Sequence, residues 1–387
     1  MRDGLIKDLE ELKSPEGYLY AGIPKFKGLF GRDSLIAAWQ LLEYDSTIAR
    51  NTLLALAKVQ GKDVIKKTGE QPGKIPHEYY SGNISDEWFD TYKKDVLWLK
   101  KEQAVYFSVD STILFVVVAA KYYEETQDKE FLKEIWPNIK RAVNWMFEYG
   151  LNDGLMMFKK LNPEDGLDSQ SWKDGIGKAI NQLEGELAIV EVQGYAYLAM
   201  LEVAKLALVM KDDQMAEQLE LSAEILRSLF MEKFWDEEKG YFVFGLDNNG
   251  QKIRSVMSNA GHLLFTGIID RDKADIIIKR LFAPDMWTKY GIRTHSTLEP
   301  EFNPRAYQLG TIWPHDNWII AQGLKKLGYN DEYERVTQAM ILAYDELDCI
   351  PELYAVTEDD RITMSELEDE PCYPQAWSTA ATINVLM

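Results

Sequence analysis

Apolar residues recur at helical spacing along nearly the whole chain, and this pattern limits the fold more than any other feature. The alternating period of a β-strand is convincing in few places. The spacing predicts twelve helices, at about 1–13, 33–43, 46–60, 109–126, 129–149, 188–210, 213–235, 257–268, 271–282, 308–327, 331–347 and 374–386. The sequence therefore predicts an all-α fold.

The predicted helices form six pairs of unlike members. One member of each pair opens with a polar and aromatic phrase: GRDS at 31–34, SVDST at 108–112, EVQGY at 191–195, SNAGH at 258–262, GTIWPHDN at 310–317 and PQAWS at 374–378. The partner is a plainer amphipathic helix with its charges on one face. An open solenoid would repeat a consensus at a fixed period, but the spacing here is irregular. We therefore expect an (α/α)6 toroid of six helical hairpins, with the N-termini of the inner helices converging on one mouth.

Four long loops separate the helices, at about 61–104, 150–187, 283–307 and 348–373. Loops longer than about 15 residues without regular structure are usually functional. No linker rich in Pro or Gly and no low-complexity tract divides the chain. We expect residues 1–387 to form a single catalytic domain.

The charge and composition favour an enzyme with a neutral ligand. The chain has 63 acidic and 43 basic residues and a formal charge of −20, whereas nucleic acids and anionic membranes require clustered Lys and Arg. Eleven Trp and twenty Tyr suit a carbohydrate pocket, because sugars stack on flat aromatic rings. The N-terminal stretch MRDGLIKDLEELK lacks the apolar run of a signal peptide, and no apolar run reaches membrane-spanning length. Two cysteines give no disulfide framework or metal spacing, so we expect a cytoplasmic protein.

The stretch GLDSQSWKDG at 166–175 places an acid next to an indole in an irregular loop. Gly166 and Gly175 interrupt any helix or strand. A polar surface turn is the alternative, but the bulky Trp172 is out of place on one. An indole that excludes water from a nearby carboxyl group raises its pKa and keeps it protonated near neutrality. This loop makes Asp174 a candidate general acid.

The four histidines stand in connecting phrases, at positions 77, 262, 295 and 315. None has the spacing that puts two metal ligands on one helical face, so we predict no metal site. Hydrogen bonds to sugar hydroxyls or structural anchoring suit them better. The sequence has no nucleophile elbow, Walker loop or dinucleotide fingerprint, and we predict no cofactor.

Carboxylates are the remaining candidates for chemistry. Those in loops or at the starts of inner helices are Asp33, Glu78, Asp110, Asp168, Asp174, Glu191, Asp316 and Glu352. A paired-carboxylate hydrolase needs one protonated and one ionised acid on opposite sides of a bond. Asp174 suits the protonated role, although Lys173 would oppose it. Glu352 follows Pro351, which fixes its backbone, but an ordinary exposed loop acid is equally consistent with the sequence.

Six phrases occur in the order found in six-hairpin glycosidases: AGIPKFKGLFGRDSLIAAW, GKIPHE, the QSWKDG loop, SNAGHLL, GTIWPHDN and PEL…CYPQAWS. From about residue 18 to the end, the chain most resembles the α-1,6-glucosidase domain of glycogen debranching enzymes. The resemblance implies an (α/α)6 toroid and inversion at the anomeric carbon. It also implies an exo-acting α-glucosidase of the debranching type.

The same resemblance implies roles for individual residues. Asp174 corresponds to the general acid, Glu352 to the general base, and Arg32 with Asp33 to the pair that binds the non-reducing sugar. A helix N-cap is the alternative role for Asp33. Further contacts to the carbohydrate are expected from His77, Glu78, Trp172, Trp313, His315, Asp316, Gln375 and Trp377.

The chain also departs from the debranching enzymes. We expect none of their extra domains, and the stretches 84–103 and 357–370 have no counterpart in them. We expect both stretches to narrow the mouth, which favours a short oligosaccharide or a small glucoside as the substrate. One alternative is a hydrolase of glucosyl- or mannosyl-glycerate compounds, with Arg32, Arg293 or Arg305 meeting the ligand carboxylate. A second is a sugar epimerase that uses His262, His295 and His315 as acid and base. A third is a toroid that binds glycans or proteins without catalysis.

Overall fold

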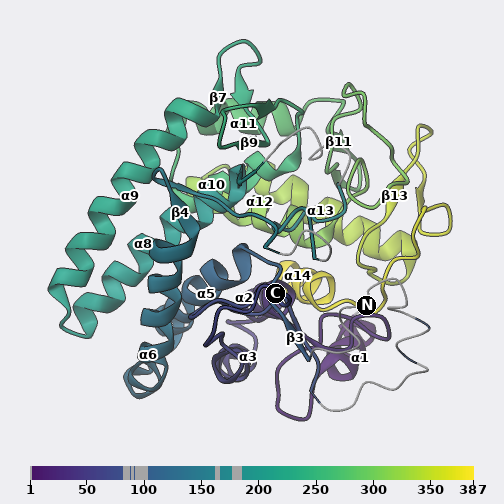
Figure 1. Cartoon of the computed structure of the whole chain (residues 1–387). Coiled ribbons are helices and arrows are strands. Elements are labelled where there is room, and N and C mark those ends of the chain that lie inside the picture. The colour runs from purple at the N-terminus through teal and green to yellow at the C-terminus, as the bar shows by residue number, and fades with distance from the viewer. Residues whose placement is uncertain (1, 82–87, 89–90, 92–102, 162–165, 177–184) are drawn as a thin grey trace.

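A computed structural model describes residues 2–81, 88, 91, 103–161, 166–176 and 185–387 (Figure 1). Every predicted helix has a counterpart in it. The helices are α1 (Arg2–Leu12), α2 (Gly31–Gln40), α3 (Ser46–Lys58), α5 (Asp110–Thr126), α6 (Lys129–Trp145), α8 (Val190–Val209), α9 (Asp213–Phe234), α10 (Leu263–Thr266), α11 (Arg271–Leu281), α12 (Pro314–Leu327), α13 (Asn330–Leu347) and α14 (Ala376–Leu386). The all-α prediction is confirmed.

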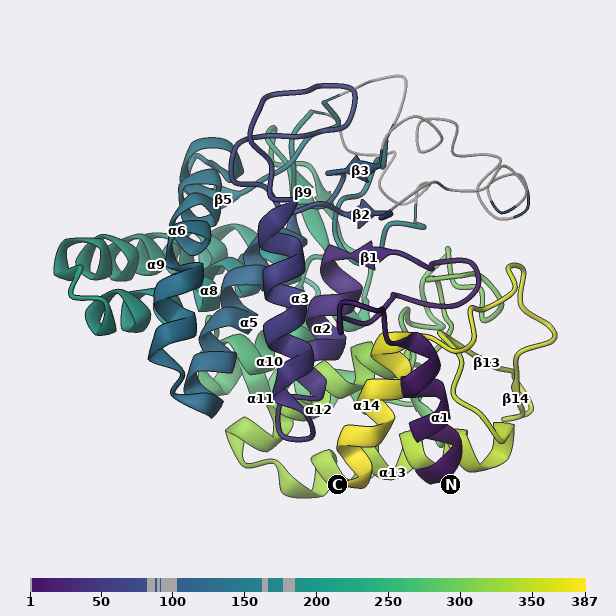
Figure 2. The ribbon, with the colours of Figure 1, turned by 90° about the horizontal axis from the view of Figure 1, so that it is seen from below.

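The helices close into two concentric rings. The inner ring runs α2, α5, α8, α10, α12 and α14, each packed against the next, and α14 returns to α2. Four inner helices pack against the outer helix that follows them: α2 with α3, α5 with α6, α8 with α9, and α12 with α13. The N-terminal α1 packs on α14, which places the first and last helices side by side (Figure 2). The predicted toroid of six hairpins is therefore correct.

Burial separates the two rings. Every residue of α2 is buried, whereas α3 has a polar outer face. Among the described helices, α8 is long and apolar enough to cross a membrane by composition, and 78% of that apolar window is buried inside the fold. Such burial is typical of a core helix. One apolar cluster extends from Leu5 near the N-terminus to Ile383 near the C-terminus.

The helix N-termini also differ between the rings. The outer helices α3, α6, α9 and α11 begin at aspartates whose side chains accept a backbone N–H of the first turn: Asp45, Asp128, Asp212 and Asp270. No side-chain cap comes from the residue that directly precedes five of the inner helices: Phe30, Val109, Ile189, Trp313 and Gln375. Acids in their first turns stand where the helix dipole favours negative charge. At α5 the cap comes from one residue earlier, because Ser108 Oγ accepts the backbone N–H of Ser111.

Two inner helices differ from their predicted bounds. The predicted helix 257–268 is a 3-10 turn, η3 (Ser258–His262), followed by the short α10, and it ends at Gly267 in the left-handed region. The helix predicted from residue 308 begins at Pro314, because the backbone of Trp313 is extended. Residues 308–313 are therefore free to form part of a loop at the mouth.

Short antiparallel strands order the long loops. One sheet has the order β1 (Leu29–Phe30), β2 (Glu78–Tyr79) and β3 (Ala104–Val105), and another the order β10 (Lys252–Ile253), β9 (Gly245–Asp247) and β6 (Leu187–Ile189). The two-stranded pairs are β4 (Leu151–Asn152) with β5 (Leu155–Met156), β7 (Trp235–Asp236) with β8 (Tyr241–Phe242), β11 (Trp287–Thr288) with β12 (Gly291–Ile292), and β13 (Ala355–Val356) with β14 (Ile362–Thr363). The first sheet leads directly into α2, and Figure 2 shows it at the N-terminal end of that helix.

Candidate active site

A cavity of about 310 Å³ opens where the inner helices begin. Its walls come from the first turns of α2 and α14, from β1 and β2, and from the loops that hold Phe26, residues 167–175, residues 307–313 and Glu352. The residues that line it are Phe26, Phe30, Arg32, Asp33, His77, Glu78, Leu167, Trp172, Asp174, Gly175, Tyr307, Gln308, Trp313, Glu352 and Trp377. Except for His315, Asp316 and Gln375, every residue predicted to contact the sugar or act on it lies on this wall. The fold thus brings together parts of the sequence more than 300 residues apart.

Arg32 joins the first hairpin to the candidate acid loop, residues 166–175. Its Nε donates to Asp110 Oδ2 at 2.7 Å, and its Nη1 donates to Asp174 Oδ2 at 3.4 Å. Burial alone lowers the pKa of Arg32, but the charges of Asp110 and Asp174 outweigh burial and raise it, so the guanidinium stays charged. A side chain at Gly31 would collide with the carbonyl oxygen of Pro76, and glycine lets this turn pack so closely.

The acid loop is packed into the protein. Trp172 is buried, stacks on His262 and meets Trp313 and His315 edge-on. The surface-turn interpretation of this stretch is therefore wrong. Lys173 points away from Asp174 and donates to the carbonyl oxygen of Thr294 at 2.5 Å. The charge of Lys173 therefore does not lower the pKa of Asp174.

Asp174 stands at the end of this loop with its side chain 24% exposed to the cavity. Burial raises the pKa of Asp174, the charge of Arg32 lowers it, and Asp110 raises it again; the net shift is upward. This is the direction that a general acid needs near neutral pH.

Gln308 holds both sides of Asp174. Its Nε2 donates to the carbonyl oxygen of Trp172 at 2.8 Å, and its Oε1 accepts from the backbone N–H of Gly175 at 2.7 Å. One side chain therefore fixes the backbone before and after Asp174. The sequence prediction missed this residue.

Glu352 is 2% exposed, so the interpretation as an ordinary exposed acid is wrong. Its Oε1 accepts from the Tyr307 hydroxyl at 2.5 Å, and its Oε2 accepts from the backbone N–H of Cys372 at 3.1 Å. Burial raises the pKa of Glu352 to about 7, although both hydrogen bonds lower it. At neutral pH a substantial fraction of the group is therefore ionised, as a general base requires.

Asp33 is the third buried acid of the cavity. Burial raises its pKa to about 8, Arg32 lowers it, and Glu352 raises it. Gln375 Nε2 donates to Asp33 Oδ1 at 3.4 Å. Asp33 is not an N-cap, because Phe30 holds that position and no side chain caps α2. Its carboxyl group is thus available to the cavity.

His315, Asp316 and Gln375 lie behind the cavity wall. The His315 ring stacks on Trp377 with centroids 3.7 Å apart, and burial holds its pKa well below the ordinary value. Asp316 accepts a hydrogen bond from His262 Nε2 at 2.7 Å. These residues support the wall from within, and their contact with a sugar stays a prediction.

The histidines do not assemble an acid–base pair. His77 lines the cavity beside Glu78, with 3.6 Å between Nε2 and Oε1, whereas His262, His295 and His315 are buried away from it. Burial lowers the pKa of His295 to about 3. In the described part of the chain, no group of three or more His, Cys, Asp or Glu residues is arranged to hold a metal ion.

The described cavity wall offers no unpaired cation. Arg32 is engaged by two aspartates; Arg293 donates to the carbonyl oxygens of Gly310 and Val356. Arg305 is exposed and pairs with Glu366. Arg293 and Arg305, expected to meet a ligand carboxylate, lie off the cavity.

The family follows from comparison with known proteins. A family model described as the mannosylglycerate hydrolase MGH1-like glycoside hydrolase domain matches residues 30–354. The chain belongs to this family. The expected six-hairpin glycosidase is confirmed as a superfamily. Within it, the matching family corresponds to the alternative hydrolase of glucosyl- or mannosyl-glycerate compounds rather than to the debranching enzymes.

Characterised relatives of this MGH1-like domain are distant. The mannosylglycerate hydrolase of Rubrobacter radiotolerans is 27% identical over 115 residues, which cover 28% of this chain and 26% of that protein. The N,N'-diacetylchitobiose phosphorylase of Vibrio proteolyticus is 22% identical over 382 residues, or 80% of this chain and 45% of that protein. The chain thus spans less than half the length of these curated relatives.

Solved structures match this chain over more than nine-tenths of its length. The mannosylglycerate hydrolase of Thermus thermophilus, determined with Tris and D-glycerate, has a TM-score of 0.75 and 16% identity over 99% of this chain and 98% of its own. A rhamnosidase of Bacillus sp. GL1 has a TM-score of 0.61 and 14% identity over 92% of this chain and 31% of its own. These likenesses establish the (α/α)6 fold.

Sequence reasoning missed several residues of the MGH1-like site. Phe26 and Phe30 stand inside the quoted AGIPKFKGLFGRDS phrase, whereas Tyr307 and Gln308 precede GTIWPHDN. Tyr307 and Gln308 could have been found because an aromatic residue and an amide stand side by side just before the GTIWPHDN phrase. The segment 84–103 falls almost wholly outside the described residues. The segment 357–370 includes β14, pairs with Arg305 and does not line the cavity.

Proposed function

We propose that this chain is an inverting, exo-acting α-glycoside hydrolase that cleaves a small glycoside of the mannosylglycerate type. The observation that carries the proposal is one cavity that holds two desolvated carboxyl groups, Asp174 and Glu352, from loops nearly half the chain apart. In this proposal Asp174 donates a proton to the leaving oxygen. Glu352 removes a proton from the attacking water.

The size and aromatic lining of the cavity support exo action. A space of about 310 Å³ suits one sugar ring with a short aglycone rather than an internal stretch of a polymer. Trp313 and Trp377 offer flat apolar faces, and Asp33 offers a carboxylate for vicinal hydroxyls. The proposed sugar therefore lies against α2 and α14, with its anomeric carbon toward the two acids.

A small neutral α-glucoside is the second candidate substrate. One observation favours it: Arg32 is the sole Lys or Arg among the described lining residues, and Asp110 and Asp174 already neutralise it. A glycerate carboxylate would lie beside acids without an unpaired cation from this part of the chain. This candidate keeps the α-glucosidase activity expected from the sequence and replaces the polymer with a small substrate.

A substrate panel tests the proposal. The protein is incubated with α-mannosylglycerate, α-glucosylglycerate and isomaltose, and released monosaccharide is measured. Release from the glycerate compounds at least tenfold above that from isomaltose supports the first candidate, and the reverse order supports the second. No release from any α-glycoside would overturn the hydrolase proposal.

The same assay separates hydrolysis from phosphorolysis, the reaction named for the Vibrio relative. Each substrate is tested with and without inorganic phosphate, and sugar phosphate is measured beside free sugar. Glu352 supplies a base for water, so we expect free sugar at a rate that phosphate does not raise. A product found only as sugar 1-phosphate would contradict a water-activating role for Glu352.

A further inference from the structure

A second cavity lies beside the acid loop, on the side away from the catalytic cavity. It has a volume of about 320 Å³, within the range of small-molecule sites. One wall comes from α6, the residues that follow it and the loop that holds Gln71 and Lys74. The other comes from β4, the segment after β5 and Glu186 just before β6. Its lining residues are Gln71, Lys74, Trp145, Glu148, Tyr149, Leu151, Asn152, Met157, Phe158, Lys159, Leu161, Gln170 and Glu186.

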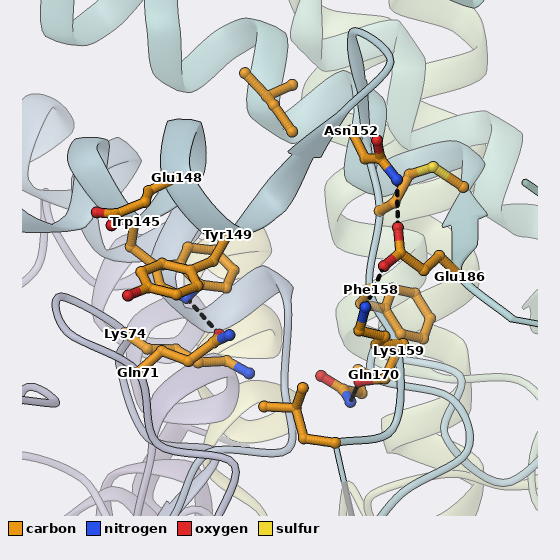
Figure 3. Close-up of a pocket in the computed structure, with 13 residues that line it drawn as sticks. Gln71, Lys74, Trp145, Glu148, Tyr149, Asn152, Phe158, Lys159, Gln170 and Glu186 are labelled. Carbon is orange, nitrogen blue, oxygen red and sulfur yellow. Dashed lines mark hydrogen bonds and ion pairs between the residues drawn. The ribbon is translucent and has the colours of Figure 1, made fainter. Parts of the chain in front are cut away.

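The first wall is aromatic and ends in an amide. Figure 3 shows the rings of Trp145 and Tyr149 close together on this wall, above Gln71 and Lys74. Gln71 Oε1 accepts from the Trp145 indole N–H at 2.9 Å, which fixes the indole and leaves the Gln71 amide N–H groups toward the cavity. Aromatic rings of this kind stack on the C–H face of a sugar, and amides bind its hydroxyls.

The opposite wall is polar and internally paired. Lys159 donates to Glu186 Oε1, and Asn152 donates to the other carboxylate oxygen (Figure 3). Glu148, the remaining acid of the lining, is exposed. The charges of Lys159 and Glu186 therefore cancel each other locally.

Lys74 lines this cavity without a counter-ion from the described part of the chain. It is 4% exposed, and Figure 3 shows its ammonium end extending into the space between the walls. Its contact in the described part of the chain is the Trp145 ring, 5.5 Å from Nζ, without an ion pair or side-chain hydrogen bond. Burial lowers the pKa of Lys74 to about 7, with no acidic neighbour to raise it. A buried cation without a counter-ion is costly, and an anion in the cavity would relieve that cost.

We propose that this cavity is a second binding site, distinct from the catalytic one, for a small polyhydroxy carboxylate such as a sugar acid. Its carboxylate pairs with the Lys74 ammonium, its hydroxyls bond the amides of Gln71 and Gln170, and its carbon chain packs on Trp145 and Tyr149. A neutral polyol satisfies the amides but leaves Lys74 without a counter-ion. The site therefore selects the acid over the matching alcohol.

Calorimetric titration with D-gluconate and with sorbitol tests the site, because the two differ in the carboxylate alone. We expect gluconate to bind at least tenfold more tightly than sorbitol at pH 6. Protonated Lys74 falls from about nine-tenths at pH 6 to about one-tenth at pH 8 for a pKa of about 7, so gluconate affinity falls about tenfold. Equal binding of acid and alcohol, or no binding of gluconate, would overturn the proposal.

Lys74→Met keeps the length of the side chain and removes its charge. Gluconate binding and its pH dependence are expected to be lost in this variant and kept in Lys133→Met, which removes an exposed lysine of α6 paired with Glu130. Gluconate binding that survives in Lys74→Met would place the acid elsewhere, including the catalytic cavity, and would overturn the assignment. If Lys74→Met fails to fold, Gln71→Leu is the second variant, because Gln71 also lines this cavity. Unchanged gluconate affinity in Gln71→Leu would overturn the assignment. None of these measurements depends on glycoside turnover.

Discussion

The Tyr307 hydroxyl donates to Glu352 Oε1 across 2.5 Å, the shortest link between a lining residue of the catalytic cavity and either candidate acid. The bond joins two loops: residue 307 stands before α12, and residue 352 stands before α14. It stabilises the ionised form of Glu352 against the burial that opposes it. Tyr307 therefore helps set the pH at which Glu352 can act as a base.

Tyr307→Phe should raise the pKa of Glu352, because it removes a hydrogen bond to the carboxylate. The acid limb of the pH dependence of kcat/KM should move to higher pH, and activity at pH 6 should fall about tenfold. Tyr106→Phe is the control: it removes a hydroxyl that donates to the carbonyl oxygen of Val59, away from the cavity. An unchanged acid limb in Tyr307→Phe would mean that Glu352 does not govern it.

Glu352→Gln should make the unfolding free energy of the protein depend less on pH. The folded pKa of about 7 exceeds the ordinary 4.5, so Glu352 costs no stability below pH 4.5 and increasingly destabilises the fold up to pH 7. The full cost is about 3 kcal/mol, at about 1.4 kcal/mol for each pKa unit. The unfolding free energy of the variant minus that of wild type should rise by about this amount between pH 4.5 and pH 8. Urea melts across this range provide the measurement.

Glu366→Gln is the matched control for that experiment. Glu366 pairs with Arg361 at the surface, and the pair lowers its pKa. Its removal should change stability little and with the opposite pH trend. If the difference in unfolding free energy between Glu352→Gln and wild type did not change with pH, burial would not be raising the pKa of Glu352.

Gln308→Ala should impair proton donation by Asp174, because Gln308 fixes the backbone on both sides of the acid. Misplacement of a catalytic group by about 1 Å costs about 10²-fold in rate. We expect that loss with a natural glycoside and almost none with a dinitrophenyl glycoside, whose leaving group needs no proton. Asp174→Asn should show the same leaving-group pattern. An equal loss on both substrates in Gln308→Ala would assign Gln308 a different role.

The sequence predicted the ring well because its evidence is local. Apolar periodicity identifies a helix from a dozen neighbouring residues, and the alternation of decorated and plain helices is visible without any contact. The phrase GRDS placed Arg32 and Asp33 at the start of an inner helix, and the structure has them there. The start of α12 was missed by six residues, since the turn chemistry before Pro314 gives no periodic signal.

The contacts inside the site were beyond a sequence-based argument. Tyr307 meets Glu352 across 45 positions of sequence, and Gln308 meets Gly175 across 133. Such pairs depend on how loops meet after the ring has closed, and no spacing rule encodes that. The second cavity was invisible for the same reason, because Lys74 and Gln170 come from different loops.

Asp33→Asn should weaken substrate binding without unfolding the protein. Above its pKa of about 8, Asp33 is a carboxylate that can accept two sugar hydroxyls. Each charge-assisted bond contributes about 1.5–3 kcal/mol, and an amide replaces only part of that. Both KM and kcat/KM should worsen, the latter by about 10²-fold. The melting temperature at pH 8 should not fall, because a buried charge is removed. A variant that unfolds but stays fully active in its folded fraction would give Asp33 a structural role instead.

The stereochemistry of the product tests the two acids as a pair. An inverting hydrolase separates its carboxyl groups by about 6.5–9.5 Å to admit a water, whereas a retaining one holds them about 5–5.5 Å apart. Asp174 and Glu352 reach one cavity from separate loops. Gln308 fixes the backbone around Asp174. Tyr307 and the backbone N–H of Cys372 donate hydrogen bonds to Glu352. With Glu352 activating water and Asp174 protonating the leaving oxygen, an α-glycoside should release the β-sugar first. Proton NMR of the earliest turnovers reads the anomer directly.

Variants complete that test, because each acid alone should contribute about 10²–10⁴-fold to the rate. Asp174→Asn should lose the alkaline limb of the pH profile, and Glu352→Gln should lose the acid limb. Because an inverting route forms no covalent intermediate, azide added to Glu352→Ala should give at most a β-glycosyl azide from an α-glycoside. Initial release of α-sugar by the wild-type enzyme would reject inversion. Full activity in Glu352→Gln would instead reject Glu352 as the base and leave the stereochemical result standing.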